Sequence, residues 1–158
     1  MKFFPEGGQR TRILTLEEIA RLLTACTAHS RPFVLLALNT GVRRGEILGL
    51  TWDRIDLAAG VLTLTHTKNG KGRRIPMNDL VREMLRALPR SGPYVFGGDR
   101  PYGAIKTAWR AACRPASLNG VRFHDLRHTA ATYMVLGGAD LPTVKELLGH
   151  SDIALTLR

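Results

Sequence analysis

The stretch FHDLRHTAAT, residues 123–132, says more about the fold than any other part of this chain. It places His124 and Arg127 three residues apart at a predicted helix start, so both side chains lie on one face of that helix. The glycine pair Gly137 and Gly138 is expected to end the helix, because glycine readily adopts the backbone conformation found after helix C-termini. One anion can therefore meet an imidazole and a guanidinium at the same place.

His128 follows His124 by four residues, a spacing that also suits two ligands of a metal ion. No third ligand lies nearby in the sequence, and the cation of Arg127 would repel a metal. We therefore expect His128 to pack or to form hydrogen bonds. No metal or other cofactor is predicted.

Two further motifs flank this stretch. TGVRRGEIL, residues 40–48, places Arg43 near a predicted helix start, with Glu46 three residues later to orient it or to form a surface pair. LGHS, residues 148–151, places His150 after a glycine that is expected to stop a helix. Taken singly, Arg43 also fits a solvated surface arginine, and His150 fits a histidine that binds a helix-terminal carbonyl.

A basic hairpin separates the first motif from the second. The string TKNGKGRRIP, residues 67–76, has glycine-containing turn chemistry, and the segments before and after it read as strands. Its tip carries Lys68, Asn69 and Lys71, and Arg73 follows them. Exposed hairpin tips are also basic for solubility alone. No Walker-type phosphate loop is present, and the acidic residues do not cluster as in a two-metal nuclease.

The composition favours a polyanionic partner. The chain has 158 residues and a net charge of +10, which suits the neutralisation of phosphates, although a merely soluble basic protein also fits. No apolar run reaches transmembrane length, and residues 1–12 lack the apolar centre of a signal peptide. We therefore expect a cytoplasmic protein in which Cys26 and Cys113 remain free thiols rather than a disulfide.

The order of periodic segments predicts a mostly helical α+β domain with one small three-stranded antiparallel sheet. Residues 1–14 read as an irregular lead-in, and residues 15–158 read as the domain itself. Thr15 and Glu18 form a capping-box pattern at the first helix. Strands are expected at 55–57, 61–66 and 73–77, and helices at 16–26, 32–38, 43–50, 79–88, 101–113, 124–136 and 143–148.

Together these motifs resemble the catalytic domain of the tyrosine recombinases, the phage-integrase family. The resemblance covers residues 10–158 and includes five residues in family-like order: Arg43, Lys68, His124, Arg127 and His150. It implies the DNA breaking-rejoining fold of that family. In the family the nucleophilic tyrosine follows the Leu-Gly-His histidine by nine residues, at position 159 here, just beyond Arg158. The N-terminal core-binding domain of the family is likewise not part of the sequence.

The resemblance also implies a role for each of these residues. Arg43 and Arg127 would clamp the scissile phosphate, and permanently charged, bidentate guanidiniums suit that task. Lys68 would protonate the leaving 5′-oxygen, His124 would act as a base or hydrogen-bond partner, and His150 would donate to the phosphate. The tyrosine would form a 3′-phosphotyrosine link, so neither ATP nor a metal is implied.

Double-stranded DNA is the expected partner, and the family resemblance implies self-association on DNA as a tetrameric synapse. We expect DNA contacts from Lys68, Asn69, Lys71 and Arg73 in the hairpin and from Arg100 and Lys106 around residues 101–113. A solvated helix face explains the last two equally well. Without its tyrosine the chain is expected to be inactive in cleavage. The alternative is a non-catalytic DNA-binding module derived from a degenerate or truncated integrase.

Overall fold

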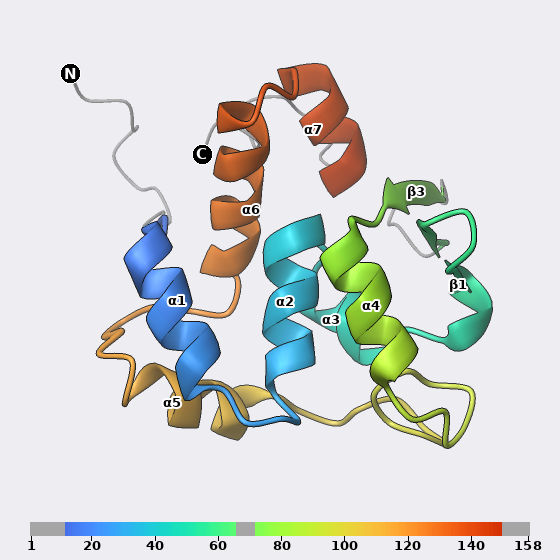
Figure 1. The fold of residues 1–158 in the computed structure, drawn as a ribbon, viewed down its shortest axis with the longest axis horizontal. Coiled ribbons are helices and arrows are strands. Elements are labelled where there is room, and N and C mark those ends of the chain that lie inside the picture. Colours follow the sequence, from blue (N-terminus) through green and yellow to red (C-terminus); the bar gives the residue numbers. More distant parts are fainter. Residues whose placement is uncertain (1–11, 66–71, 150–158) are drawn as a thin grey trace.

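The computed structural model describes residues 12–65 and 72–149 (Figure 1). In these ranges the chain forms mostly helices and one small sheet, as the sequence predicted. The helices are α1 (Leu16–Ala25), α2 (Arg31–Thr40), α3 (Arg44–Leu48), α4 (Asp79–Ala87), α5 (Lys106–Cys113), α6 (Asp125–Leu136) and α7 (Leu141–Leu148), with a 3₁₀ turn η1 (Trp52–Arg54) after α3.

Local signals explain where several helices begin and end. Thr15 accepts a hydrogen bond from the backbone N–H of Glu18, and the Glu18 carboxylate accepts one from the N–H of Thr15, which confirms the predicted capping box of α1. Gly41 ends α2 and Gly149 ends α7, both in the left-handed conformation that glycine adopts without strain. The helix expected from residue 101 begins only at Lys106.

The sheet is antiparallel, with the order β1 (Ile55–Asp56), β2 (Val61–Leu64) and β3 (Arg73–Pro76). Leu62 pairs with Ile75, and Leu64 pairs with Arg73. Side chains of β3 alternate between buried and exposed, so Arg73 lies on the same inward face as Ile75. The predicted three-stranded sheet is therefore confirmed, while the tip of its hairpin, residues 66–71, lies outside the described ranges.

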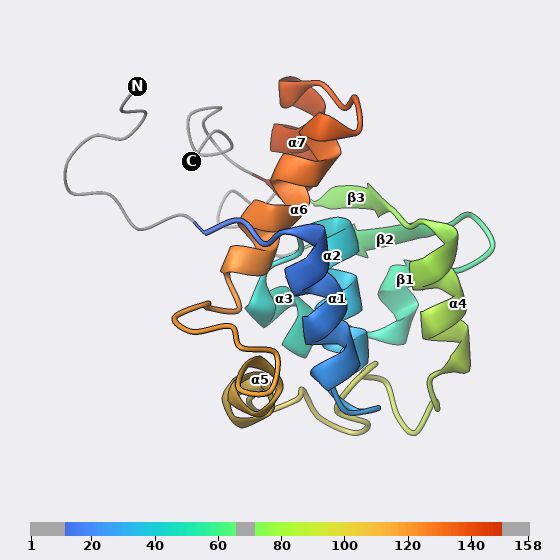
Figure 2. The ribbon, with the colours of Figure 1, turned by 60° about the vertical axis from the view of Figure 1, so that its left-hand side comes forward.

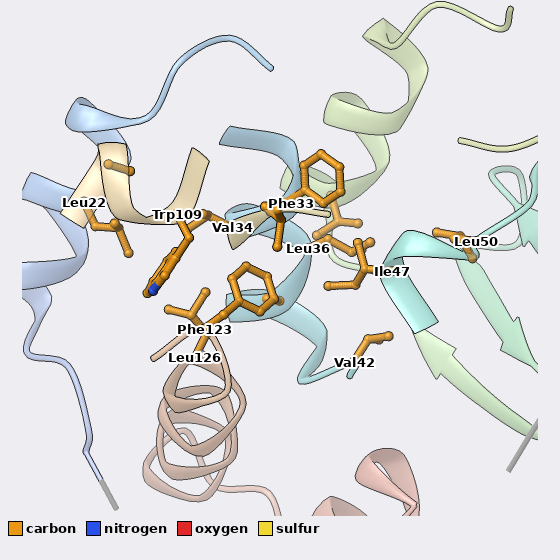
Figure 3. Packing of buried hydrophobic residues seen from close by; sticks show 14 of the residues in the cluster. Leu22, Phe33, Val34, Leu36, Val42, Ile47, Leu50, Trp109, Phe123 and Leu126 are labelled. Carbon is orange, nitrogen blue, oxygen red and sulfur yellow. The ribbon is translucent and has the colours of Figure 1, made fainter. Parts of the chain in front are cut away.

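Helix α2 runs through the centre of the molecule, with α1 and α6 on one side and α3 and α4 on the other (Figure 1). Its side chains are apolar on nearly every face, and Phe33 and Leu36 are almost fully buried. Figure 3 shows the apolar side chains that surround it from several helices. Trp109 of α5 meets Phe123 edge to face, with ring centroids 5.3 Å apart. One apolar core therefore joins all of these helices.

Helix α7 packs on the upper part of α6, at the end of the molecule opposite α5 (Figures 1 and 2). A separate small apolar cluster of Ala131, Val144 and Leu148 holds the two helices together. Helix α7 also contacts β3. The end of α7 thus lies between the helix that carries Arg127 and the strand that begins with Arg73.

The last part of the lead-in is fixed against α6. Leu14 is fully buried; its N–H donates to Thr129 Oγ1 at 3.1 Å, and its carbonyl accepts from the Tyr133 hydroxyl at 2.9 Å. Cys26 and Cys113 are free thiols. Among the helices of the described ranges, none is long and apolar enough to cross a membrane.

Candidate phosphodiester site

Arg127 lies at the centre of the candidate site, in the first turns of α6. Only 3% of its surface is exposed. Its Nη1 donates to the carbonyl of Gly41 at 2.6 Å, and its Nη2 donates to the carbonyl of Leu148. These two bonds use two of the five N–H donors of a guanidinium. Arg127 therefore joins α6 to the end of α2, just ahead of Arg43, and to the end of α7, just ahead of His150.

The surroundings of Arg127 disfavour its positive charge. Burial lowers the pKa of Arg127 to about 9, and the nearby charges of Arg43 and Arg73 act in the same direction. The carboxylate of Glu46 opposes this effect. Arg127 still carries its charge at neutral pH. The positive charges of Arg127, Arg43 and Arg73 therefore outnumber the single negative charge of Glu46. An anion placed among them would relieve their mutual repulsion.

Arg43 occupies the position just before α3, as its motif predicted. Its backbone N–H donates to Glu46 Oε2 at 2.8 Å, and its Nη1 lies 3.5 Å from Glu46 Oε1. The side chain of Arg43 remains 42% exposed. Its backbone is therefore anchored while its guanidinium can reach a ligand. Arg44 beside it is exposed.

Glu46 receives its main ion pair from Arg73. Nη1 and Nη2 of Arg73 lie 2.8 and 2.7 Å from the two carboxylate oxygens, in a bidentate pair, and the Arg73 side chain is only 6% exposed. Burial raises the pKa of Glu46, but the hydrogen bonds from Arg73 and Arg43, together with their charges, bring it below its ordinary value. Glu46 is thus a carboxylate shared by two arginines.

Arg73 makes a third contact, because its Nε donates to the carbonyl of Leu147 at 2.9 Å. We expected Arg73 to contact DNA, yet in this structure its guanidinium is buried and engaged inside the protein. The reason is its place in β3, where strand alternation directs it inward with Ile75. The neighbouring Arg74 points outward and is exposed.

His124 is exposed at the start of α6, and its ring lies edge to face with that of His128, with centroids 4.9 Å apart. Partial burial, His128 and Arg127 lower the pKa of His124, so its imidazole is largely neutral at pH 7. Burial likewise lowers the pKa of His128. A neutral His124 can accept a proton or a hydrogen bond. In the ranges that the structure describes, no group of three or more acidic, histidine or cysteine side chains could hold a metal.

The remaining predicted residues fall into two groups. Lys68, Asn69, Lys71 and His150 lie outside the described ranges. Arg100 and Lys106 are exposed, but Lys106 begins α5, at the end of the molecule opposite α7 (Figures 1 and 2). The structure therefore brings together Arg43 and Arg127, with His124 close enough to Arg127 to feel its charge. It does not bring Lys106 to the same place.

The sequence predicted that Glu46 could orient Arg43 or form a surface pair with it, but it did not predict that Arg73 binds Glu46. The alternation of Arg73 with Ile75 was the available signal, because it assigns Arg73 to the buried face of β3. The arrangement offers the two guanidiniums of Arg43 and Arg127 with one neutral imidazole nearby, because Arg73 is engaged inside the protein. Such a set suits the stabilisation of negative charge on a phosphodiester.

Comparison with known proteins identifies the family of the chain. Residues 12–158 match the phage integrase family. The tyrosine recombinase XerC of Azotobacter vinelandii is 36% identical over 170 residues, which cover 96% of this chain and 56% of that protein. Curated relatives are covered over 32% to 56% of their own length, so the chain spans about half of them or less.

Solved structures show the same fold. The catalytic domain of bacteriophage HP1 integrase superimposes with a TM-score of 0.78 at 28% identity, covering 94% of this chain and 86% of that one. A lambda integrase dimer bound to a core site has a TM-score of 0.74 at 22% identity, covering 95% and 61% of the two chains. The chain therefore belongs to the phage integrase family of tyrosine recombinases and has the fold of their catalytic domains.

Proposed function

We propose that this chain is the catalytic domain of a site-specific DNA recombinase or integrase, acting on duplex DNA in the cytoplasm. One observation carries the proposal: the buried Arg127 links the backbone beside Arg43 to the turn that precedes His150. Three motifs that are distant in the sequence thereby meet around one guanidinium. Membership of the phage integrase family supports the same reading.

The proposed reaction exchanges one phosphodiester for another. A tyrosine hydroxyl attacks the scissile phosphorus and loses its proton, and the bond from phosphorus to the 5′-oxygen breaks. Arg43 and Arg127 stabilise the charge on the nonbridging oxygens, and His150 adds a further donor. Lys68 gives a proton to the leaving 5′-oxygen, and His124 serves as base or hydrogen-bond partner. The products are a 3′-phosphotyrosine link and a free 5′-hydroxyl, and attack by a partner strand's 5′-hydroxyl reverses the step.

None of the tyrosines in the chain is well placed to act as this nucleophile. The Tyr133 hydroxyl donates to the Leu14 carbonyl, and the Tyr102 hydroxyl lies 2.8 Å from His29 Nε2. Tyr94 lies in an isolated bridge with Thr51. We propose that the nucleophile stands at position 159, and that residues 1–158 alone cleave no DNA.

Adduct formation tests the proposal. The chain is extended through a tyrosine at position 159 and its own downstream sequence, and is then incubated with nicked DNA carrying its site. A covalent protein–DNA adduct is expected, and phenylalanine at that position should abolish it. An adduct formed by residues 1–158 would instead assign the nucleophile to Tyr94, Tyr102 or Tyr133. If the extended chain forms no adduct, it is a non-catalytic DNA-binding module.

DNA binding is testable with the 158 residues themselves. The +10 charge supports binding that is dominated by phosphate contacts. With six or more contacts, affinity should fall by roughly 10³-fold or more between about 50 and 200 mM salt. A flat salt response would contradict this mode of binding.

Self-association on DNA is part of the proposal, and the dimer that lambda integrase forms on its core site supports it. Sedimentation with and without the DNA site measures it.

Lys68, Asn69 and Lys71 are proposed to contact DNA from the hairpin tip. Arg100 and Lys106 are proposed to form a separate contact at the α5 end. The double substitution Arg100→Ala/Lys106→Ala should then weaken DNA binding and reduce the slope of log affinity against log salt by about one per lost contact. Arg44→Ala is a matched control for the loss of an exposed charge. An affinity that stays unchanged would identify Arg100 and Lys106 as part of a solvated face.

A further inference from the structure

Arg73 is a buried arginine beside the site that the proposed reaction does not use. Its guanidinium contacts two separate parts of the molecule at once. Two nitrogens bind the carboxylate of Glu46 on α3 at 2.8 and 2.7 Å, and the third binds the carbonyl of Leu147 at the end of α7 at 2.9 Å. All three guanidinium nitrogens thus have a partner inside the protein.

Glu46 also contacts Arg43, so it links Arg73 to Arg43. The carboxylate oxygen that accepts from Arg73 Nη2 also accepts from the backbone N–H of Arg43 at 2.8 Å. The other oxygen accepts from Arg73 Nη1 and lies 3.5 Å from Arg43 Nη1. Because Arg73 occupies the carboxylate in a bidentate manner, it fixes the plane of the group that anchors Arg43. Without Arg73, Glu46 would be free to rotate toward the Arg43 guanidinium.

The contact with α7 has a similar effect on the opposite side. Arg73 binds the carbonyl of Leu147, and Arg127 binds the next carbonyl along, that of Leu148. A cation near the last carbonyls of a helix is favourable. Gly149 lies directly over the Arg73 guanidinium, since a Cβ at that position would be 3.1 Å from Nη1. Arg73 therefore supports the turn that leads to His150.

We infer that Arg73 is a positioning residue for strand cleavage: it holds Glu46, and through Glu46 it holds Arg43, in the orientation that meets the phosphate. The inference rests on the proposed function. It assigns to Arg73 an internal role instead of a direct contact with DNA. Its complete set of internal partners carries this assignment, because all three guanidinium nitrogens of Arg73 already donate to groups inside the protein.

A charge-balanced substitution tests the inference. Glu46→Leu with Arg73→Met removes the ion pair without changing net charge, and apolar replacement of a buried pair is often neutral or stabilising for the fold. In the extended chain, this double variant should keep its fold and its DNA affinity, with a small fall in melting temperature because the Leu147 carbonyl loses its donor. Its single-turnover cleavage rate should nevertheless fall about 10–100-fold, the scale expected when a reacting group is misplaced. Arg74→Gln, an exposed change on the same strand, is the matched control and should retain the rate.

A second substrate separates positioning from general loss of structure. A methylphosphonate carries a methyl group in place of one nonbridging oxygen, so it lacks the negative charge that Arg43 is proposed to neutralise. Arg43→Ala and the double variant should therefore lose much less rate on methylphosphonate than on phosphate. Arg73→Lys, which keeps the charge but not the bidentate geometry, should recover only part of the rate on phosphate.

Other results would overturn the inference. Equal losses on the two substrates would mean that the pair serves only the fold, and a double variant as active as Arg74→Gln would mean that the pair is dispensable for cleavage. These outcomes leave the proposed function intact. By contrast, failure of the unsubstituted extended chain to form any adduct overturns the proposed function, and this inference with it.

Discussion

The main core and the attachment of α7 are built in different ways. The main core consists of buried apolar side chains from helices α1 to α6 and the sheet, including Leu22, Leu36 and Leu126 (Figure 3). Helix α7 contributes only Val144 and Leu148 to a small apolar cluster with α6. Its last carbonyls are held instead by two buried arginines. The main core is thus fixed by apolar packing. The end of α7 at Leu147 and Leu148, which forms the rim of the site, is fixed by charged donors.

The difference matters because the two kinds of contact respond to different changes. Apolar packing depends on shape and volume, and it is indifferent to pH or to a bound anion. Guanidinium–carbonyl and guanidinium–carboxylate bonds depend on charge. An incoming phosphate therefore acts on the rim and leaves the core unchanged. Substitutions in the main core and around the end of α7 should therefore differ in their effects.

Leu126→Ala should give the largest loss of stability, because Leu126 is fully buried in the main core. The free energy of unfolding should fall by about 2–5 kcal/mol, as for other leucine truncations that leave a cavity. Urea denaturation measures it. Leu136→Ala in the same helix is the control: Leu136 is 74% exposed, and its loss should change stability by less than about 0.5 kcal/mol. Similar losses in the two variants would contradict the burial of Leu126 in the main core.

Arg127→Met should destabilise the rim specifically. It leaves the carbonyls of Gly41 and Leu148 without their donor, at a cost of about 1–3 kcal/mol. Amide hydrogen exchange in α7 should accelerate more than exchange in α2. Arg43→Met, which removes a more exposed guanidinium, should leave exchange in α7 unchanged. Uniform acceleration across the whole domain would show that α7 is not a separate unit.

Gly41→Ala should cost about 1–2 kcal/mol, the strain of a left-handed conformation for alanine, before any clash is counted. Gly41 has φ of +68°, and a Cβ there would overlap the Leu148 side chain, so the substitution pushes α7 away from α2. Gly45→Ala should have the opposite sign, because a Cβ at Gly45 meets nothing within 4 Å and alanine favours helix α3. Thermal melts compare the two. A stabilising Gly41→Ala would contradict the close approach of α2 and α7.

Acidification should give the smallest effect, and it should appear in two steps. The pKa values of His124 and His128 are lowered in the fold, so the unfolded chain binds more protons below about pH 6.5 and stability falls as the pH drops through that region. The pKa of Glu46 is also lowered, which adds a further loss below about pH 4.3. His124→Asn/His128→Asn should remove only the first step. Stability that rises between pH 6.5 and 5 would show that the sign is wrong.

Local signals in the sequence predicted much of the fold. The capping box at Thr15, the helix stop at Gly149 and the strand within residues 73–77 each depend on residues close in the chain, and the structure has all three. The late start of α5 at Lys106 was not predicted. Residues 101–105 carry two of the chain's punctuating residues, Pro101 and Gly103, which delay the helix.

Local sequence patterns could not predict the hydrogen-bond partners of the site residues. Arg127 binds carbonyls 86 and 21 residues away, and Arg73 binds a carboxylate 27 residues away. A basic residue next to a basic hairpin resembles a DNA contact until its strand register is known. The motifs therefore predicted that Arg43 and Arg127 lie close together, while the choice between a ligand contact and an internal contact depended on tertiary packing.

The attachment of Leu14 to α6 has a consequence for the order in which the chain folds. The Leu14 carbonyl accepts from the hydroxyl of Tyr133, which is synthesised 119 residues later. At roughly 5–20 residues per second, a ribosome needs roughly 6–24 seconds to synthesise that interval. Throughout it, Leu14 lacks the hydroxyl of Tyr133 that helps to fix it to α6. The junction between the lead-in and the domain is therefore among the last contacts to form during synthesis, and it is available to chaperones until α6 is complete.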